Sequence, residues 1–226
     1  MPGYCRPVMI AVVDYHAGNA PSVRYALDHL GIPSRLVDSP RGLATAERIV
    51  LPGVGAARAT LASLAESGLD VALADRVRDG VPFLGICIGL QVLFEHSEEG
   101  DTDCLGWVPG TVRRFPADRR VPQIGWNEVR FARDHPVTRA LPPAGHYYFV
   151  NSYYCAPADP ADVLGVTDYG FEFCSVVARD NVVATQFHAE KSGALGLDLL
   201  RGFAAWDPAR RSGTEPARRS GTEPAC

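Results

Sequence analysis

The chain has 226 residues, of which 46% are hydrophobic and 21% are charged, with a formal net charge of −4 at pH 7. This balance is ordinary for a globular protein with one sizeable core, and it lacks the basic surplus of a nucleic-acid-binding protein. No apolar run approaches the ~20 residues that span a bilayer, so we expect no contact with membranes. The few cysteines make a disulfide framework improbable and favour the reducing cytoplasm.

The first half of the chain alternates short apolar runs with amphipathic segments. Val8–Val13, Arg48–Leu51 and Val81–Ile86 are bounded by Gly, Pro or Asp, as expected for strands buried on both faces. Ala20–Leu30 and Leu61–Arg78 carry apolar residues at helical spacing. The alternation predicts a doubly wound α/β domain with an open, mostly parallel central sheet flanked by helices.

The second half predicts antiparallel strands added to that sheet. Gly125–Phe131 and His146–Tyr154 alternate in polarity and are rich in aromatic residues. Val182–Gln186 predicts one more buried strand, and Gly193–Trp206 predicts a closing helix. We therefore expect one domain over residues 1–207.

The segment 208–226 is different in kind. The eight residues ARRSGTEP at 209–216 recur unchanged at 217–224. A unit without an apolar face cannot bury a core, so we expect a disordered tail. A duplication without a role is favoured over a binding function.

The six cysteines suggest neither a disulfide framework nor a metal site. They include no CxxC pair and no Cys/His cluster with zinc spacing. We expect reduced thiols, no metal and no cofactor. A functional cysteine must therefore be argued from its surroundings.

Cys87 has such surroundings, in Gly85-Ile-Cys-Ile-Gly89 between a predicted strand and a helical stretch at Leu90–Glu95. This is the cysteine counterpart of the G-x-S-x-G elbow, a sharp strand-to-helix turn that presents a nucleophile. Side chains at the two glycines would collide, and the helix dipole favours a thiolate. The N–H of Ile88 can face an oxyanion. For an isolated G-x-C-x-G, a buried structural cysteine is the commoner explanation.

A thiol nucleophile needs a base and a group that orients the base. His188 and Glu190 stand two residues apart after the last predicted strand. In an extended segment they share one face, so the carboxylate can hold the imidazole. A surface histidine beside a charged turn is the alternative.

The turn Pro52-Gly53-Val54-Gly55 also follows a predicted strand. It lacks the Lys-Ser/Thr of a P-loop and the third glycine of a dinucleotide fingerprint. A turn whose peptide N–H can point at an oxyanion fits better.

These three motifs, in this order, resemble the class I glutamine amidotransferase family, and more narrowly the glutaminase subunits of imidazole glycerol phosphate synthase. The resemblance runs from about Val8 to Trp206. Further matching segments are Asp14–Asn19, Gln91–Glu95, Ser97–Glu99, Gly106-Trp107, Gly125–Asn127, Tyr148–Tyr154 and Lys191-Ser192.

The resemblance implies hydrolysis of L-glutamine to glutamate and ammonia through a thioester. Cys87 would attack the side-chain amide, His188 would protonate the departing ammonia, and Glu190 would hold His188. Gly53 and Val54 would join Ile88 in stabilising the oxyanion. The residues implied to bind the amino-acid end of glutamine are Gln91, Ser152 and Tyr153.

The resemblance also implies a partner, a (β/α)8-barrel synthase subunit that forms a heterodimer with the chain. That subunit would receive the ammonia and make imidazole glycerol phosphate and aminoimidazole carboxamide ribotide in histidine biosynthesis. The positions implied to lie at the interface are Asn19, Trp126, Tyr148 and Lys191.

The chain departs from the family pattern at a few places, none of which removes a catalytic atom. Ala189 stands in place of the proline of HPE, which loosens the turn between His188 and Glu190. The other departures are His16, Ala20, Gln123 and Asn151. His16, Gln123 and Asn151 raise the alternative of a paralogue that feeds another synthase in specialised metabolism. A cysteine hydrolase of another substrate and a non-catalytic binding module are further alternatives.

Overall fold

The computed structural model describes residues 8–16 and 19–209, so the expected disordered tail lies almost wholly outside the described residues. The strands are β1 Ile10–Val13, β2 Ser34–Val37, β3 Arg48–Gly53, β4 Phe83–Cys87, β5 His96–Ser97, β6 Thr102–Asp103, β7 Gly110–Arg114, β8 Gln123–Phe131, β9 Ala144–Asn151, β10 Tyr153–Pro157, β11 Val163–Asp168, β12 Glu172–Arg179 and β13 Val182–Thr185. The helices are α1 Ala20–His29, α2 Pro40–Leu43, α3 Ala57–Glu66, α4 Leu69–Arg78, α5 Ile88–Gln91 and α6 Gly193–Ala205, with 3-10 turns η1 Pro160–Asp162 and η2 Ala189–Lys191.

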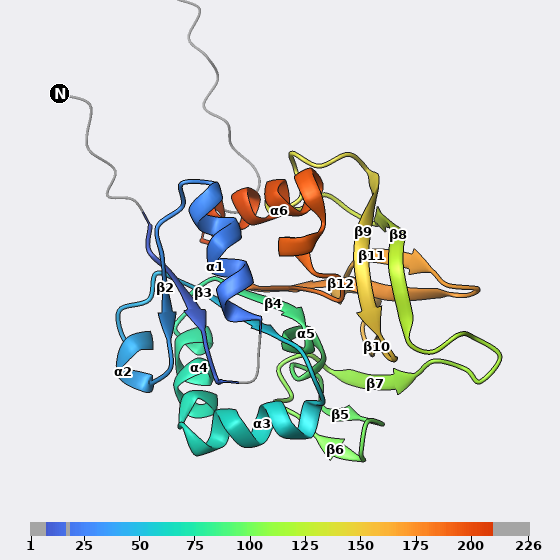
Figure 1. Cartoon of the computed structure of the whole chain (residues 1–226), viewed down its shortest axis with the longest axis horizontal. Coiled ribbons are helices and arrows are strands. Elements are labelled where there is room, and N and C mark those ends of the chain that lie inside the picture. Colours follow the sequence, from blue (N-terminus) through green and yellow to red (C-terminus); the bar gives the residue numbers. More distant parts are fainter. Residues whose placement is uncertain (1–7, 17–18, 210–226) are drawn as a thin grey trace, which may run out of the picture.

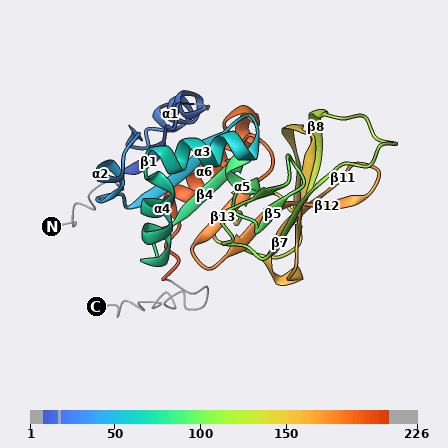
Figure 2. The same ribbon diagram turned by 90° about the horizontal axis from the view of Figure 1, so that it is seen from below.

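The centre of the sheet is parallel, as the sequence predicts. Strands β2, β1, β3, β4 and β13 lie side by side in that order, and each adjacent pair is parallel. Strand β12 then pairs antiparallel with β13, and the antiparallel strands continue from there. Figure 2 shows these strands, among them β7, β8 and β11, gathered on the side away from α2.

Helices cover both faces of the parallel strands (Figure 1). Residues of β1 alternate between the two resulting cores because successive strand side chains point to opposite faces. Ile10 and Val12 pack with α1 and α6, whereas Ala11 and Val13 pack with α3 and α4. This double burial explains why the strand sequences are continuous apolar runs.

Two helix predictions are wrong in their extent. The single helix expected over Leu61–Arg78 is two helices, α3 and α4, because Gly68 takes a left-handed conformation with φ 67°. The stretch expected over Leu90–Glu95 is the short α5, which begins at Ile88 and ends at Gln91. The strand expected over His146–Tyr154 is also interrupted, with β9 ending before Ser152 and β10 beginning after it.

Candidate active site

Cys87 forms a strained turn at the carboxyl end of β4. It is the last residue of that strand and the N-cap of α5, with φ 57° and ψ −107°. Such a conformation costs a non-glycine residue about 1–3 kcal/mol, and strain of this kind concentrates at functional sites. The sequence therefore identified the elbow at its true position.

The two flanking glycines are required by backbone contacts. A Cβ on Gly85 would lie 2.4 Å from the carbonyl oxygen of Gly89, and a Cβ on Gly89 would lie 2.0 Å from that of Leu51. Neither contact can be relieved by turning a flexible side chain. Both positions therefore exclude a side chain, as the sequence predicts.

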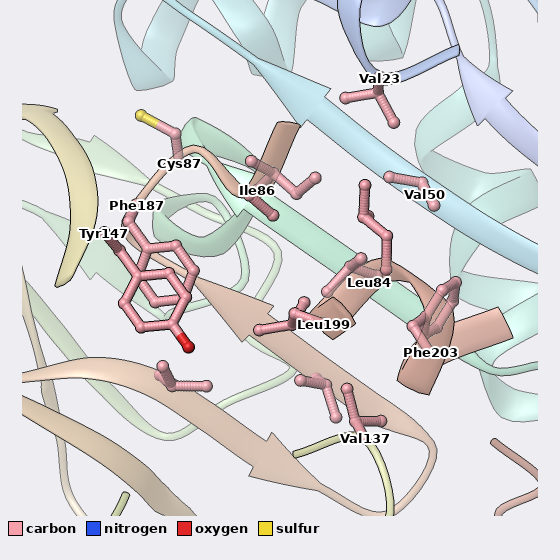
Figure 3. Packing of buried hydrophobic residues seen from close by; sticks show 14 of the residues in the cluster. Val23, Val50, Leu84, Ile86, Cys87, Val137, Tyr147, Phe187, Leu199 and Phe203 are labelled. Carbon is pink, nitrogen blue, oxygen red and sulfur yellow. The ribbon is translucent and has the colours of Figure 1, made fainter. Parts of the chain in front are cut away.

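The Cys87 sulfur faces polar groups rather than the core. Figure 3 shows it pointing away from the hydrophobic side chains around Ile86. The Gln186 side-chain nitrogen lies 3.8 Å from the sulfur, and the Val150 carbonyl oxygen lies 4.0 Å from it. With the residue only 8% exposed, the thiol is sheltered but lies in a polar setting.

The Pro52–Gly55 turn stands directly beside the elbow. In the parallel pairing of β3 with β4, Gly53 is the register partner of Cys87. A Cβ on Gly53 would lie 1.9 Å from the Tyr15 hydroxyl and 2.3 Å from an Ile88 methyl carbon, so only glycine fits there. Val54 is 42% exposed, which leaves this turn at the surface next to the sulfur.

His188 and Glu190 form the pair that the sequence predicts, although through a different local structure. The His188 Nδ1 atom lies 2.8 Å from a Glu190 carboxylate oxygen, and the two side chains are 3% and 0% exposed. The segment is not extended as expected: His188 precedes the 3-10 turn η2, which contains Glu190. The turn itself brings the carboxylate back to the imidazole.

The charged form of His188 is favoured in this site. Burial is the largest single influence and lowers its pKa, but the bonds and charges of Cys87 and Glu190 together outweigh it and raise the pKa from 6.5 to about 10. His188 is therefore positively charged at neutral pH beside the sulfur. Its charged form stabilises the fold fully below pH 6.5, and this contribution is lost as the pH rises through about 10.

Replacing the carboxylate tests this electrostatic arrangement. We expect Glu190→Gln to lower kcat/KM by about 100-fold or more, because the imidazolium loses its charged partner. The pKa of His188 should fall, so the alkaline limb of the pH–rate profile should move to lower pH. Glu172→Gln, at a side chain 53% exposed, is the control and should change neither quantity. An unshifted alkaline limb in Glu190→Gln would contradict the pairing.

The three residues expected to bind the substrate lie near the elbow. Gln91 closes α5 and is buried, and its side-chain nitrogen lies 3.0 Å from the Gln186 side-chain oxygen and 3.4 Å from the Tyr153 carbonyl oxygen. Ser152 and Tyr153 are half-buried between the ends of β9 and β10. They follow Val150, whose carbonyl oxygen lies 4.0 Å from the Cys87 sulfur.

A family model described as glutamine amidotransferase class-I matches residues 11–204. The chain belongs to this family. It is 47% identical over 196 residues to the imidazole glycerol phosphate synthase subunit HisH of Dehalococcoides mccartyi, with 86% of this chain and 96% of that protein covered. It is 48% identical over 206 residues to the subunit of the same name in Herpetosiphon aurantiacus, with 91% and 98% covered.

Solved structures agree at the level of the fold. A crystal structure of a glutamine amidotransferase matches with a TM-score of 0.69 at 21% identity, covering 85% of this chain and 96% of that one. PurLQS from Thermotoga maritima matches with a TM-score of 0.70 at 18% identity, covering 88% and 98%. The class I amidotransferase fold expected from the motifs is thus confirmed.

In this amidotransferase, Ser192 stabilises the turn in which alanine replaces the usual proline. The Ser192 hydroxyl donates to the His188 carbonyl oxygen at 2.6 Å and accepts from the Tyr148 N–H at 3.0 Å. The His188 N–H in turn donates to the Tyr148 carbonyl oxygen at 2.9 Å. These bonds tie the turn to β9, so Ala189 does not leave His188 unsupported.

Asn19, which the sequence predicts at a partner interface, contacts Glu190 through its side chain. Its side-chain nitrogen donates to the same Glu190 oxygen that faces His188. Lys191 is exposed on the same turn. Glu190 thus has the half-buried Asn19 in contact with its carboxylate and the exposed Lys191 as its neighbour in the chain.

The other two expected interface residues belong to a larger group of exposed or half-buried apolar residues. We define the apolar face as Ile124, Trp126, Tyr148 and Val150. In the pairing of β8 with β9, Ile124 is opposite Val150 and Trp126 is opposite Tyr148. Ile124 is 63% exposed and Trp126 is 53% exposed. Trp126 and Tyr148 are the two of these four residues that the sequence predicts at an interface.

Sequence reasoning also missed Gln186, which it placed only as the end of a buried strand. A polar residue in an otherwise apolar run, two positions before the expected base, is the signal that points to it.

Within residues 8–16 and 19–209, no group of three or more His, Cys, Asp or Glu side chains is placed to hold a metal ion. In the same ranges, no helix has the length and apolarity needed to cross a membrane.

Proposed function

We propose that the chain is the glutaminase subunit of an imidazole glycerol phosphate synthase and that Cys87, His188 and Glu190 are its catalytic triad. The observation that carries the proposal is the buried His188–Glu190 pair beside the strained Cys87 elbow. In this pair the His188 Nδ1 atom lies 2.8 Å from the Glu190 carboxylate oxygen. The identity of 47–48% to subunits of that name supports the choice of reaction.

In the proposed reaction the Cys87 thiolate attacks the side-chain amide carbon of glutamine. The Ile88 N–H and the peptide between Gly53 and Val54 stabilise the tetrahedral oxyanion. Imidazolium His188 gives its proton to the nitrogen, the C–N bond breaks, and ammonia leaves a thioester. Neutral His188 then takes a proton from water, which attacks the thioester and releases glutamate and the thiolate.

We further propose that Gln91, Ser152 and Tyr153 hold the amino-acid end of the substrate. Ser152 and Tyr153 offer hydroxyl and backbone groups at the junction of β9 and β10, next to the strand whose Val150 carbonyl lies 4.0 Å from the Cys87 sulfur. A glutamine molecule in that place directs its side-chain amide at the sulfur. Gln91 is included because its side-chain nitrogen lies 3.4 Å from the Tyr153 carbonyl oxygen.

The partner in this proposal is a (β/α)8-barrel synthase subunit that docks on the apolar face. The Val150 carbonyl beside the sulfur belongs to the same strand as two residues of that face. A subunit seated there therefore covers the catalytic site and takes up ammonia before it reaches solvent. Exposed aromatic and aliphatic residues of this kind are typical of interface centres.

Loss of the exposed indole should weaken this assembly. We expect Trp126→Ser to raise the Kd for the barrel subunit by about tenfold or more, because aromatic anchors carry much of an interface's binding energy. Titration calorimetry measures the change. The control is Val71→Ser, which removes a 63% exposed apolar side chain from α4 and should leave the Kd unchanged. Equal Kd values for the two variants would remove the apolar face from the proposal.

The experiment that tests the function uses the full chain with a barrel subunit of an imidazole glycerol phosphate synthase. We expect the two to co-purify and glutamate release to rise when the barrel's substrate is added. Low activity of the isolated chain is expected, because in this proposal the Pro52–Gly55 turn presents its N–H to the oxyanion only when the partner and its substrate are bound. Full activity without the partner would contradict that gating.

A second candidate keeps the glutaminase chemistry but changes the synthase. It is favoured by Gln123 and Asn151, two departures from the family pattern that face each other as register partners on β8 and β9, next to the apolar face. Both side chains are buried, at 0% and 5% exposure, so they would act on a partner through the shape of the sheet and not by direct contact. Failure of the co-purification, with glutaminase activity intact, would support this candidate.

We also propose that the glutaminase domain ends near residue 207 and that it works in the cytoplasm. Trp206 is 4% exposed, and its carbonyl oxygen accepts from the buried Arg48, so packing extends to this point. Cys155 and Cys174 are register partners on β10 and β12 yet both are free thiols. Unpaired neighbouring thiols suit a reducing compartment.

A further inference from the structure

Gln186 contacts the reacting sulfur, and the proposed mechanism gives it no part. It follows β13 and is 0% exposed. Its side-chain nitrogen lies 3.8 Å from the Cys87 sulfur, within the range of an N–H···S hydrogen bond. A buried amide is kept in a core only when its polar atoms are used, so this contact calls for a reason.

The surrounding bonds determine which end of the Gln186 amide faces the sulfur. The Tyr153 carbonyl oxygen can only accept, so the Gln91 atom 3.4 Å from it must be the amide nitrogen. That nitrogen also lies 3.0 Å from the nearer atom of Gln186, which must then be the oxygen. The remaining end of Gln186, its NH2 group, is the one beside Cys87.

The backbone on both sides of Gln186 is fixed. Its N–H donates to the Ser175 carbonyl oxygen at 2.8 Å. The next residue, Phe187, points into the core, where its ring lies 4.2 Å from that of Tyr147 (Figure 3). Gln186 and His188 flank this anchor and both interact with Cys87.

We propose that Gln186 is a positioning residue of the glutaminase, whose amide N–H holds the Cys87 sulfur and favours its thiolate. An N–H donor stabilises the charged form of its acceptor more than the neutral form. The bond also directs the sulfur while the substrate space is empty. This inference rests on the proposed role of Cys87 as the nucleophile.

Several titratable groups interact with the Cys87 sulfur, and a variant that tests Gln186 must leave these residues unchanged. They are His188 after β13, Glu190 through His188, Tyr15 after β1 and Cys155 on β10. A change at Gln186 alters none of these residues. A shift in the titration of the Cys87–His188 pair therefore reports the lost donor.

The test measures the pH dependence of Cys87 alkylation by iodoacetamide in the full-length chain, with the Cys87 adduct quantified by peptide mass spectrometry. Gln186→Met keeps the length of the side chain and removes the donor. We expect the midpoint to rise by about one pH unit, a roughly tenfold loss of thiolate. We also expect a lower kcat, and a higher KM as well, because the same change removes the oxygen that accepts from the Gln91 amide.

The matched control is Thr185→Val, which removes a buried hydrogen bond of 2.9 Å to the Phe187 carbonyl oxygen in the same segment. It should lower stability without moving the midpoint. Should Gln186→Met not fold, the isosteric Gln186→Glu replaces it, and its carboxylate should also raise the midpoint. An unchanged midpoint in a folded Gln186 variant would overturn the inference. Glutaminase activity in Cys87→Ala would instead overturn the proposed function, and the two failures are therefore distinguishable.

Discussion

Cys87→Ala is expected to lower glutamine hydrolysis by about 10⁴-fold or more, since no thioester can form without the sulfur. The variant should still fold and bind its partner. The residue is only 8% exposed and closes β4 without a covalent bond to another part of the chain. Glutamate release by the purified complex measures the first quantity, and co-elution with the barrel subunit measures the second.

Cys104→Ala is the control for this experiment. Cys104 is a half-buried free thiol, and burial raises its pKa to about 11, so it carries little thiolate at neutral pH. Its loss should leave glutamate release unchanged. A similar loss in both variants would point to a general effect of cysteine removal rather than to a nucleophile at position 87.

Gly89→Ala is expected to lower the free energy of unfolding by about 2–4 kcal/mol, more than any other substitution proposed above, and to abolish activity. The added Cβ would lie 2.0 Å from the Leu51 carbonyl oxygen, so α5 must move away from β3 and take the elbow with it. The midpoint of chemical denaturation measures the effect.

Gly31→Ala separates this collision from the general cost of replacing a glycine. Gly31 has φ 69°, and among the described atoms none lies within 4 Å of an added Cβ there. We expect a loss of only about 1 kcal/mol from backbone strain. Equal losses at the two positions would mean that the contact with Leu51 does not constrain the elbow.

The sequence predicts the elements that depend on residues close together in the chain. The parallel strands are visible because burial on both faces requires continuous apolar runs, and the elbow is visible because Gly85 and Gly89 are both needed. His188 and Glu190 are two residues apart, so their pairing is also a local matter. The order of the three motifs along the chain then carries the resemblance to a known family.

What the sequence does not predict depends on contacts between distant segments. Gln186 meets Cys87 only because β13 lies next to β4 in the sheet, and no periodicity shows that pairing. Asn19 reaches Glu190 across 171 positions of the chain. The break at Gly68 was missed for a different reason, since the apolar spacing continues across it and hides the change of direction.

The most direct test of the account is to trap the intermediate. The complex of the chain with the proposed barrel subunit is mixed with L-glutamine, quenched in acid and digested. Each cysteine-containing peptide is then examined by mass spectrometry. We predict a glutamyl thioester on Cys87 that is absent from Glu190→Gln at the same early time and never forms in Cys87→Ala. A glutamyl adduct on another cysteine, or undiminished glutamate release by Cys87→Ala, would contradict the account.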